Sequence, residues 1–573
     1  MFGSFHHRTL HYLLLLGVGA VLTLPNLGVP SLWDIDEGVN AEAAREMIES
    51  GNFVVPRFNF QLRDAKPALL YWLQAGSYRL LGVNEFAARL PSALAAILSA
   101  LLVYELARLM FGSAAGLLSG IVAVSSFLVC ALARFANPDA ILLASTCLTF
   151  LVFFAGYAPR RPGEGARGAW FIPFGIACGI GMLAKGPVAL VLPSAVIFIF
   201  LVWQRQLALL WDRRLLWSCG AFALVALPWY IMVTIETRGA FAKGFFLTNN
   251  INRFMAPMED HRGPIWYHPL VLLAGFAPWS IFLLPPIWYA IRGIRNPAIS
   301  ERLIDARAIL RPIAMRFLIC WCIVYLIFFS LSATKLPNYT LPMYPALAIL
   351  TADFLNRWRR REIQPPRWVM AYCFGWLFVF GIGTSAGLAV AAGEWPLAGA
   401  KFPQFPLLSS WIWLGLIPVV GGILIAVFAL ADRRSKAMTV LCGTAIAFVG
   451  GMIGFAATGV DAAKAPRPLV ADAATWRRDR DIRLASFQYS QPSLVFYNQR
   501  EVRPLLNEQQ VLEFLYFPVP SFLFVPETAW QQLRQKGFGL GTPVARHRDF
   551  YRNCDILVIA NQPADQAAIV SRD

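Results

Sequence analysis

Long apolar stretches alternate with short polar segments over the first 460 residues of the chain. A helix that crosses a bilayer needs about 20 mainly apolar residues, and about thirteen stretches approach that length. They lie at 10–28, 86–109, 114–133, 139–157, 169–185, 187–203, 215–235, 268–290, 313–332, 337–355, 368–391, 407–430 and 438–459. The pattern therefore predicts a mainly α-helical, polytopic membrane protein with about thirteen transmembrane helices.

Two of the connecting segments are long, at 29–85 and 237–267. The first contains a short amphipathic stretch at 40–50 and an apolar, aromatic stretch at 67–81 that has proline in its first turn. Neither stretch is predicted to cross the membrane. Both predict helices that lie in the membrane interface rather than crossing it.

After Val460 the chain becomes polar, and the periodicity changes. Strand-like runs occur at 482–489, 521–526 and 556–560, and helix-like runs at 508–516 and 527–536. These runs predict a small α/β domain at 461–573, which follows a transmembrane domain at 1–460.

Composition supports the membrane assignment and charge gives it an orientation. The chain is 57% hydrophobic and only 14% charged, against about 25% charged in an average soluble domain. The net charge of +17 raises the question of nucleic acid. However, the positive residues gather in alternate short loops, which is the positive-inside pattern of a membrane protein. We therefore expect a membrane partner and no nucleic acid.

The basic loops contain roughly twenty positive residues and the alternate loops about four, a bias typical of the cytoplasmic side. The basic set is Arg160, Arg161, Arg167, Arg205, Arg213, Arg214, Arg292 to Arg311, Arg357, Arg359, Arg360, Arg361, Arg433, Arg434 and Lys436, and the sparse set is Arg134, Lys185, Lys335 and Lys401. This bias predicts a cytoplasmic N-terminus, and an odd span count places the C-terminal domain in the periplasm, outside a bacterial inner membrane.

Six ionisable residues lie in or beside apolar segments on the predicted outer face: Asp36, Glu37, Lys66, Asp139, Lys185 and Lys335. Charges near hydrocarbon are costly, and they mark pathways and reaction sites more often than chance. Each also has a simpler interpretation. The acids can cap helices, Lys66 can snorkel to the interface, and the other two lysines can anchor tight outer turns.

Taken together, these residues favour a phosphate site. Lysines and Arg253 suit a phosphate or pyrophosphate leaving group, and Lys66 directly precedes a predicted helix N-terminus, which favours anions. Asp36 and Glu37 are candidates to accept a proton or to hold a cation. We expect a lipid with a phosphate head group, stabilised electrostatically as it departs. No nucleotide-binding glycine fingerprint is present. The sequence establishes no cofactor. The acids are compatible with a divalent metal but do not by themselves define a metal site.

The order of the motifs resembles the bacterial lipid-linked-sugar glycosyltransferases of the C-class membrane fold, above all the aminoarabinose transferases of lipid A and the protein O-mannosyltransferases. The resemblance covers nearly the whole membrane part. It rests on WDIDEGVNAEAAREM, KPALLYW, GVNEFAARLPSA, ARFANPD, AKGPVALVLP, LPWY, NNINRF followed by HRGPIWYH, and FSLSATKLPNYTLPMYPALAIL.

The resemblance implies roles for individual residues. Asp36 matches a proposed base or acceptor-positioning group and Asp139 matches the acid of the second outer loop, while Lys66 matches the lysine that faces the lipid phosphate. The residues that match the lining of the donor cavity are Arg253, Lys335 and Tyr339, and Lys185 matches the lysine of a Lys-Gly-Pro turn. Ala65 stands where the family often has glutamate, which puts an amino sugar and a metal in question.

We therefore expect an enzyme, a hexosyl- or pentosyltransferase that moves a sugar from a polyprenyl (undecaprenyl) phosphate donor to an envelope acceptor. Lipid A, lipopolysaccharide or another lipid is the first acceptor, and a protein, as in O-mannosylation, is the alternative. A lipid-carrier flippase or a non-catalytic envelope scaffold are alternatives of another class. The chain shows no internal repeat and its charges cluster on one face, both of which weigh against a transporter. We expect a monomer.

Overall fold

The computed structural model describes residues 2–158, 170–257, 261–295, 306–395, 404–474, 482–537 and 541–561. The loop cations Arg160, Arg161, Arg167 and Lys401 lie outside these residues. All thirteen predicted apolar stretches coincide with helical elements, although several contain proline, such as Pro193 in α9 and Pro228 in α10.

The helices of the first third are α1 (Phe2–Thr23), α4 (Glu85–Phe111), α5 (Ser113–Val124), α6 (Phe127–Ala133), α7 (Asp139–Tyr157), α8 (Phe171–Lys185), α9 (Val188–Gln204) and α10 (Leu215–Glu236). The later ones are α13 (Tyr267–Gly275), α14 (Leu284–Arg295), α15 (Ala306–Leu331), α16 (Tyr344–Arg359), α17 (Arg367–Ala392), α18 (Leu416–Leu430) and α19 (Arg434–Val449). The predicted stretch at 337–355 begins as a 3-10 helix, η6 (Pro337–Met343), before α16.

Seven helices among the described residues are long and apolar enough to cross a membrane, or nine if each of two bent pairs counts as one span. The bends are 64° between α5 and α6, and 117° between α13 and the segment Trp279–Arg295. Helices α8 and α9 are apolar but have only 15 and 17 residues. The chain is thus a multi-pass membrane protein, and the figure of about thirteen spans stays a prediction.

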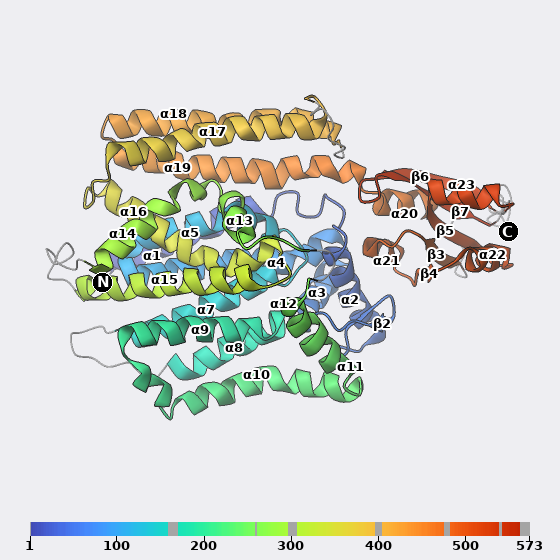
Figure 1. Cartoon of the computed structure of the whole chain (residues 1–573), viewed down its shortest axis with the longest axis horizontal. Coiled ribbons are helices and arrows are strands. Elements are labelled where there is room, and N and C mark those ends of the chain that lie inside the picture. Colours follow the sequence, from blue (N-terminus) through green and yellow to red (C-terminus); the bar gives the residue numbers. More distant parts are fainter. Residues whose placement is uncertain are drawn as a thin grey trace.

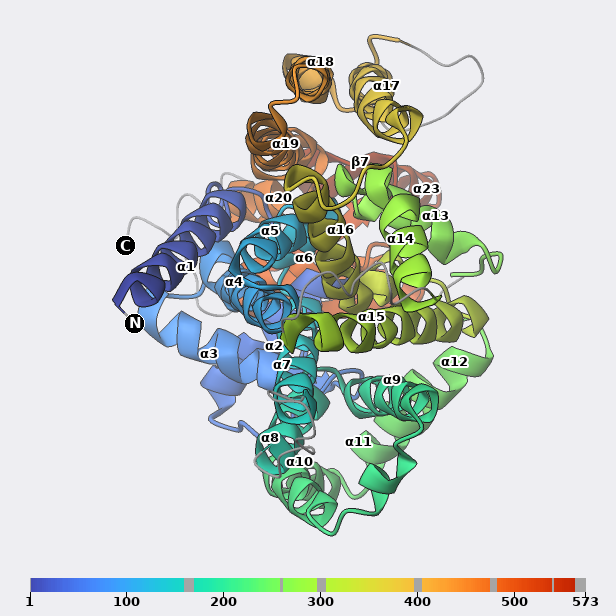
Figure 2. The ribbon, with the colours of Figure 1, turned by 90° about the vertical axis from the view of Figure 1, so that its left-hand side faces the viewer.

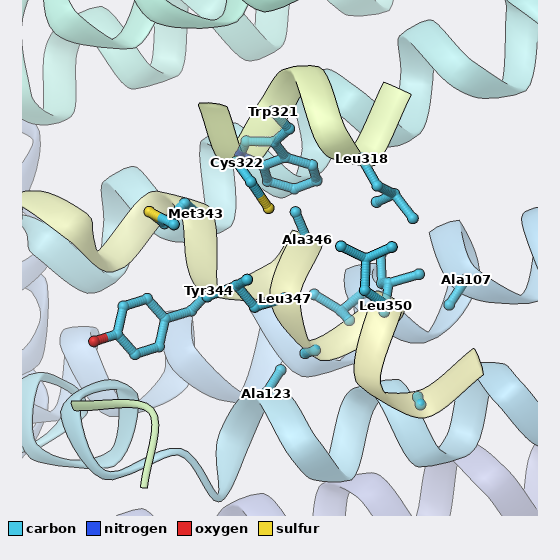
Figure 3. Close-up of a cluster of buried hydrophobic side chains, with 14 of the residues drawn as sticks. Ala107, Ala123, Leu318, Trp321, Cys322, Met343, Tyr344, Ala346, Leu347 and Leu350 are labelled. Carbon is cyan, nitrogen blue, oxygen red and sulfur yellow. The ribbon is translucent and has the colours of Figure 1, made fainter. Parts of the chain in front are cut away.

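The helices run along the longest axis of the molecule (Figure 1). Seen along that axis, α17, α18 and α19 form a group at one edge, and α8, α9 and α10 lie at the opposite edge (Figure 2). Between these groups, α16 packs against α5, α14 and α15. Leu347 and Leu350 of α16 are buried in this core together with Trp321 of α15 (Figure 3). Because α16 is covered on nearly every side, it is an internal helix that fixes the positions of its neighbours.

The first long segment folds between the bundle and the C-terminal sheet (Figure 1). It contains α2 (Asp36–Ser50), a short hairpin of β1 (Arg57–Phe58) and β2 (Gln61–Leu62), and α3 (Leu69–Leu81). Helix α3 leaves Leu80 85% exposed, as expected of an interfacial helix. Helix α2 differs from the prediction, because its residues from Glu37 to Met47 are buried on all faces.

The second long segment forms α11 (Ala240–Ala242), the π-helix η3 (Lys243–Asn252) and α12 (Arg253–Met255). It lies at the same end of the molecule as α2 and α3 (Figure 1).

The polar segment folds around a five-stranded mixed sheet of order β4-β3-β5-β7-β6. Its strands are β3 (Arg483–Phe487), β4 (Arg503–Leu505), β5 (Ser521–Pro526), β6 (Thr542–Asp549) and β7 (Cys554–Ala560), and its helices are α20 (Pro466–Ala474), α21 (Pro492–Asn498), α22 (Glu508–Tyr516) and α23 (Glu527–Gln535). The three predicted strands and two predicted helices are confirmed. The sheet lies at the opposite end of the long axis from the N-terminus (Figure 1).

Candidate active site

Asp139 and Lys185 meet at the end of the bundle that faces the sheet. Asp139 begins α7 and Lys185 ends α8, and their side chains form an ion pair. Asn338 donates a hydrogen bond of 2.9 Å to the second oxygen of Asp139. The Asp139 carboxylate is buried. These contacts hold the ammonium group of Lys185 in a fixed direction.

The turn that follows Lys185 requires glycine. Gly186 has φ +90°, and a Cβ there would lie 2.4 Å from the Phe245 ring of η3. The turn therefore brings the end of α8 against the second outer segment, where a larger residue would separate them.

Lys66 lies among these charges. Burial is the main cause that lowers the pKa of Lys66 to about 8. The positive charges of Lys185 and Arg253 lower this pKa further, and the carboxylates of Asp36 and Asp139 act in the opposite direction. Three cations from three separate segments thus gather at one place, with enough mutual repulsion to favour an anion among them.

Tyr339 contacts Arg253 and lies close to Lys185. Arg253 is hydrogen-bonded to the Tyr339 hydroxyl, and the Lys185 ammonium lies 5.9 Å from the centroid of the Tyr339 ring. Tyr339 belongs to η6, so this internal 3-10 helix positions both Asn338 and Tyr339. The structure therefore brings together five of the predicted site residues: Lys66, Asp139, Lys185, Arg253 and Tyr339.

Asp36 and Glu37 are adjacent in sequence but have different surroundings. Asp36 is the first residue of α2 and is exposed, close enough to Lys66 to raise the pKa of that lysine. Glu37 is fully buried, and each of its oxygens accepts two hydrogen bonds. The donors are Arg89 Nε and Nη2 at 2.9 and 2.7 Å, the Ala136 amide at 2.6 Å and the Trp33 amide at 2.8 Å. Glu37 thus has a structural position, and we infer that it supports α2 rather than binding substrate.

Lys335 contacts the end of a helix. Its ammonium donates to the carbonyl oxygens of Ser330 at 2.6 Å and Phe329 at 3.3 Å, at the C-terminal end of α15. Burial lowers the pKa of Lys335. Lys335 thus has a helix-capping position, in which the lysine charge favours the negative end of the helix dipole, and its place in the donor cavity stays a prediction.

Sequence reasoning missed Arg89 and Asn338. Arg89 is buried inside α4 and, besides Glu37, donates to the carbonyl oxygens of Leu27, Pro30 and Ser31. A lone arginine in an apolar stretch was the available signal, because such a charge needs a partner. Asn338 carried no signal of its own beyond its place beside Lys335.

Within the described ranges, no three His, Cys, Asp or Glu residues gather closely enough to hold a metal ion. Asp36 and Asp139 are the acids near Lys66, and Asp139 is already paired. The arrangement suits the binding and release of a phosphate next to one exposed carboxylate.

Comparisons with known proteins show which proteins the chain resembles. The model of the family described as dolichyl-phosphate-mannose-protein mannosyltransferase matches residues 65–232. The undecaprenyl phosphate-alpha-4-amino-4-deoxy-L-arabinose arabinosyl transferase of Erwinia tasmaniensis is 35% identical over 340 residues, which cover 58% of this chain and 57% of that protein. The enzyme of the same name from an Enterobacter species is 30% identical over 451 residues, which cover 77% and 75%.

The fold has a solved counterpart. The crystal structure of ArnT from Cupriavidus metallidurans bound to undecaprenyl phosphate has a TM-score of 0.77 and 22% identity, and the match covers 96% of this chain and 98% of that one. Fold, site and sequence together define a membrane glycosyltransferase of the C-class fold. Within that class, the chain belongs to the family of the undecaprenyl phosphate-aminoarabinose arabinosyl transferases. The resemblance drawn from the sequence motifs is thereby confirmed.

Proposed function

We propose that the chain transfers a sugar from undecaprenyl phosphate to a lipid acceptor, lipid A first, on the outer face of the inner membrane. The observation that carries this proposal is the gathering of Lys66, Lys185 and Arg253 beside Tyr339 and Asp139 at one end of the bundle. The names of the aligned relatives suggest the class of donor, an undecaprenyl phosphate-linked sugar, and the reaction, transfer of that sugar.

The cations bind the donor phosphate and stabilise it as it leaves. Negative charge grows on the phosphate oxygens when the bond to the sugar breaks, and positive groups already in place lower the cost of that charge. Lys185 is held by Asp139 and Asn338, so it need not reorganise during the reaction. Tyr339 holds Arg253 in the same way.

Asp36 serves the acceptor. It is exposed at the first turn of α2, near the site of the departing phosphate, where a carboxylate can accept a proton from a hydroxyl acceptor. If the acceptor is itself a phosphate, Asp36 orients it and no base is required. Asp139, the second acid predicted to be catalytic, is a positioning group for Lys185 in this scheme. No step of the scheme uses a divalent metal, whose requirement is settled by assaying with and without a chelator.

The donor sugar has two candidates. The names of the relatives make 4-amino-4-deoxy-L-arabinose the first one to test. Ala65 lacks the carboxylate that would pair with a sugar ammonium, and the neighbouring Asp64 is engaged with η3, where Asn249 lies 3.5 Å from it. A neutral pentose or hexose is therefore the second candidate for the donor sugar.

Transfer to a protein is the second candidate function. The mannosyltransferase family model matches residues 65–232, which include Lys66, Asp139 and Lys185. Glycoproteins, rather than glycolipids, would then carry the sugar.

The topology that fits this function has a cytoplasmic N-terminus and a periplasmic C-terminal domain, 461–573. The N-terminus and the sheet lie at opposite ends of the long axis, and α3 and α12 lie toward the end of the sheet (Figure 1). Lys66 precedes α3 and Arg253 begins α12, so the cation cluster of Lys66, Lys185 and Arg253 belongs to that end. In this arrangement α1, α8 and α9 also cross the membrane, which raises the number of spans toward the predicted thirteen.

The test is mass spectrometry of envelope lipids and glycoproteins from a deletion strain. The strain is compared without a complementing gene, with the wild-type gene, and with the gene for the Asp36→Ala variant. We expect one sugar-bearing lipid to disappear in the deletion strain and to return only with wild type. Its mass names the sugar and the acceptor. Loss of a glycoprotein alone would favour the second candidate. Full complementation by Asp36→Ala would show that Asp36 neither deprotonates nor orients the acceptor.

A further inference from the structure

We propose that Asp34 and Ser493 are positioning residues, which hold Asp36 in place for transfer through a contact between the first outer segment and the C-terminal domain. This inference rests on the proposed function, because it assigns Asp36 to the acceptor. It gives the C-terminal domain a task that neither motif nor family resemblance supplies.

Asp34 is held at three of its polar atoms by the C-terminal domain. Its Oδ1 accepts a hydrogen bond of 2.7 Å from the Ser493 amide, and its Oδ2 accepts one of 2.6 Å from the Ser493 hydroxyl. Its own amide donates to the Tyr551 hydroxyl at 3.0 Å. Ser493 is buried at the start of α21. A bidentate contact of this kind fixes direction as well as distance.

The residues before Asp34 are attached to the same domain. The Leu32 amide donates to the Tyr497 hydroxyl at 2.7 Å. The Lys464 ammonium donates to the Ser31 carbonyl at 2.8 Å and lies 3.9 Å from the centroid of the Trp33 ring. Every residue from Ser31 to Asp34 therefore contacts a residue beyond position 460.

The first turn of α2 lies directly on the first turn of α21. A Cβ on Gly38 would be 2.5 Å from the Ser493 amide nitrogen, so only glycine permits this approach. Asp36 is in that same turn of α2. A shift of α21 would therefore move the backbone that carries Asp36.

The membrane domain holds the opposite side of the turn. Glu37 is bonded to Arg89 of α4 and to the Ala136 amide, which lies just before α7. Asp36 thus projects from a segment that is fixed from both sides, by the bundle and by the sheet. Removing one of these attachments allows displacements of the order of 1 Å, and such a misplacement can cost about a hundredfold in rate.

Asp34 sits in a charged setting. The groups that face it are Asp549 and Lys464, with the hydroxyls of Tyr489 and Tyr551, and its own segment adds Asp36 and Glu37. Burial raises the pKa of Asp34 to about 7, and the bonds from Ser493 act against that rise. Because this pKa is higher in the docked state than in free solution, docking is favoured at low pH and loses that contribution as pH rises toward 7.

The experiment uses the full chain in lipid nanodiscs, with kcat and KM measured for donor and acceptor. Asp34→Ala removes the contact, whereas Asp34→Asn retains its shape, since the amide can accept from the Ser493 amide and donate to its hydroxyl. We expect Asp34→Ala to lower kcat at least about tenfold and to leave the donor KM within about twofold, because the phosphate cations are untouched. Ser493→Ala should show the same split, and Ser493→Thr should restore kcat.

Hydrogen exchange of residues 31–38 is the second readout, and it does not depend on activity. In the wild type, after correction for intrinsic exchange, protection should fall about tenfold or more between pH 5 and pH 8. The Asp34→Asn variant should lose this pH dependence of protection, because an asparagine side chain does not titrate between pH 5 and pH 8.

Two results would overturn the inference: kcat of a folded Asp34→Ala variant within about twofold of wild type, or an Asp34→Asn variant as inactive as Asp34→Ala, which would make the carboxylate itself the reacting group. If Asp34→Ala does not fold, Ser493→Ala with its threonine rescue decides in the same way. The proposed function has its own separate control. If wild type transfers no sugar, or if Lys66→Ala leaves the donor KM unchanged, the function fails, whatever the exchange data show.

Discussion

At the scale of single residues, the site depends on how its cations are supported. Lys185 is fixed by Asp139, and Arg253 by Tyr339. Lys66 is held by its place in a half-buried turn, between positive and negative neighbours whose effects on its pKa partly cancel. Its charge is therefore the one most readily altered by mutation or by pH.

Replacing Lys66 with alanine should weaken donor binding. A hydrogen bond to a charged group contributes about 1.5–3 kcal/mol, so we expect the donor KM to rise roughly ten- to a hundredfold. Initial rates of the purified variants at varied concentrations of the undecaprenyl phosphate-linked sugar measure this. Lys536→Ala is the matched control, since Lys536 pairs with Glu508 on the surface of the C-terminal domain. Equal effects of both substitutions would contradict the assignment of Lys66.

Donor binding should also depend on pH. The pKa of Lys66 is lowered to about 8, so the lysine is charged below that pH and neutral above it. The ratio kcat/KM for the donor should fall about tenfold per pH unit above 8, because this ratio reports the free enzyme. Lys66→Arg, which stays charged, should shift the fall to higher pH. A wild-type profile that is flat up to pH 9.5 would exclude Lys66 as the titrating group.

At the scale of elements, helix positions follow from apolar runs, but contacts between distant segments do not. The bounds of β5 and α22 match their predictions, because Pro526 ends the strand and the Asn507 side chain caps the helix. The two missed strands, β4 and β6, are the edges of the sheet. Edge strands expose polar side chains and lack the apolar pattern of a central strand.

The same limit applies to the site. The sequence indicates where charges lie, and it predicted most members of the cation cluster. It does not give the direction of a side chain, so the bonds of Lys335 to the last carbonyl groups of α15 could not be predicted. Asp34 and Ser493 are 459 positions apart, and no local pattern links residues at that distance.

Helices α8 and α10 approach closely through two glycines. A Cβ on Gly175 would lie 2.1 Å from the Ser218 carbonyl, and one on Gly179 would lie 2.8 Å from Val225. Small residues four apart permit such contact between membrane helices. Lys185 is the last residue of α8, so the packing of α8 against α10 also determines where the Lys185 ammonium lies along the long axis of the molecule.

Gly175→Ala should therefore destabilise the bundle by about 1–3 kcal/mol, because the helices must separate to admit a methyl group. Thermal unfolding of the detergent-purified protein measures the change. Gly220→Ala on α10 meets nothing within 4 Å and is the matched control; it should be neutral or slightly stabilising. A Gly175→Ala variant as stable as the control would show that the two helices are not in contact.

At the scale of the whole molecule, the long axis separates two ends of different character. One end carries the sheet, α2 and the cation cluster, and the other carries the N-terminus (Figure 1). The connection η2 (Leu207–Trp211) between α9 and α10 lies among arginines of the predicted cytoplasmic set. A bilayer between these ends would place chemistry on one side and basic loops on the other.

Reporter fusions test this orientation. Alkaline phosphatase, which is active only in the periplasm, should be active when fused after Asn561 and inactive when fused after Trp211. A fluorescent protein that matures only in the cytoplasm should give the reverse pattern and serves as the control. Activity of both phosphatase fusions, or of neither, would contradict the proposed topology.

The contact between Asp34 and Ser493 has a consequence for biosynthesis. The acidic segment leaves the ribosome among the first residues, and the serine that fixes it follows 459 positions later. At about 5–20 residues per second, this delay is roughly half a minute to a minute and a half. During that time the acidic segment lacks its contact with Ser493, so under the proposed positioning role transfer stays slow until the residues after position 460 have folded.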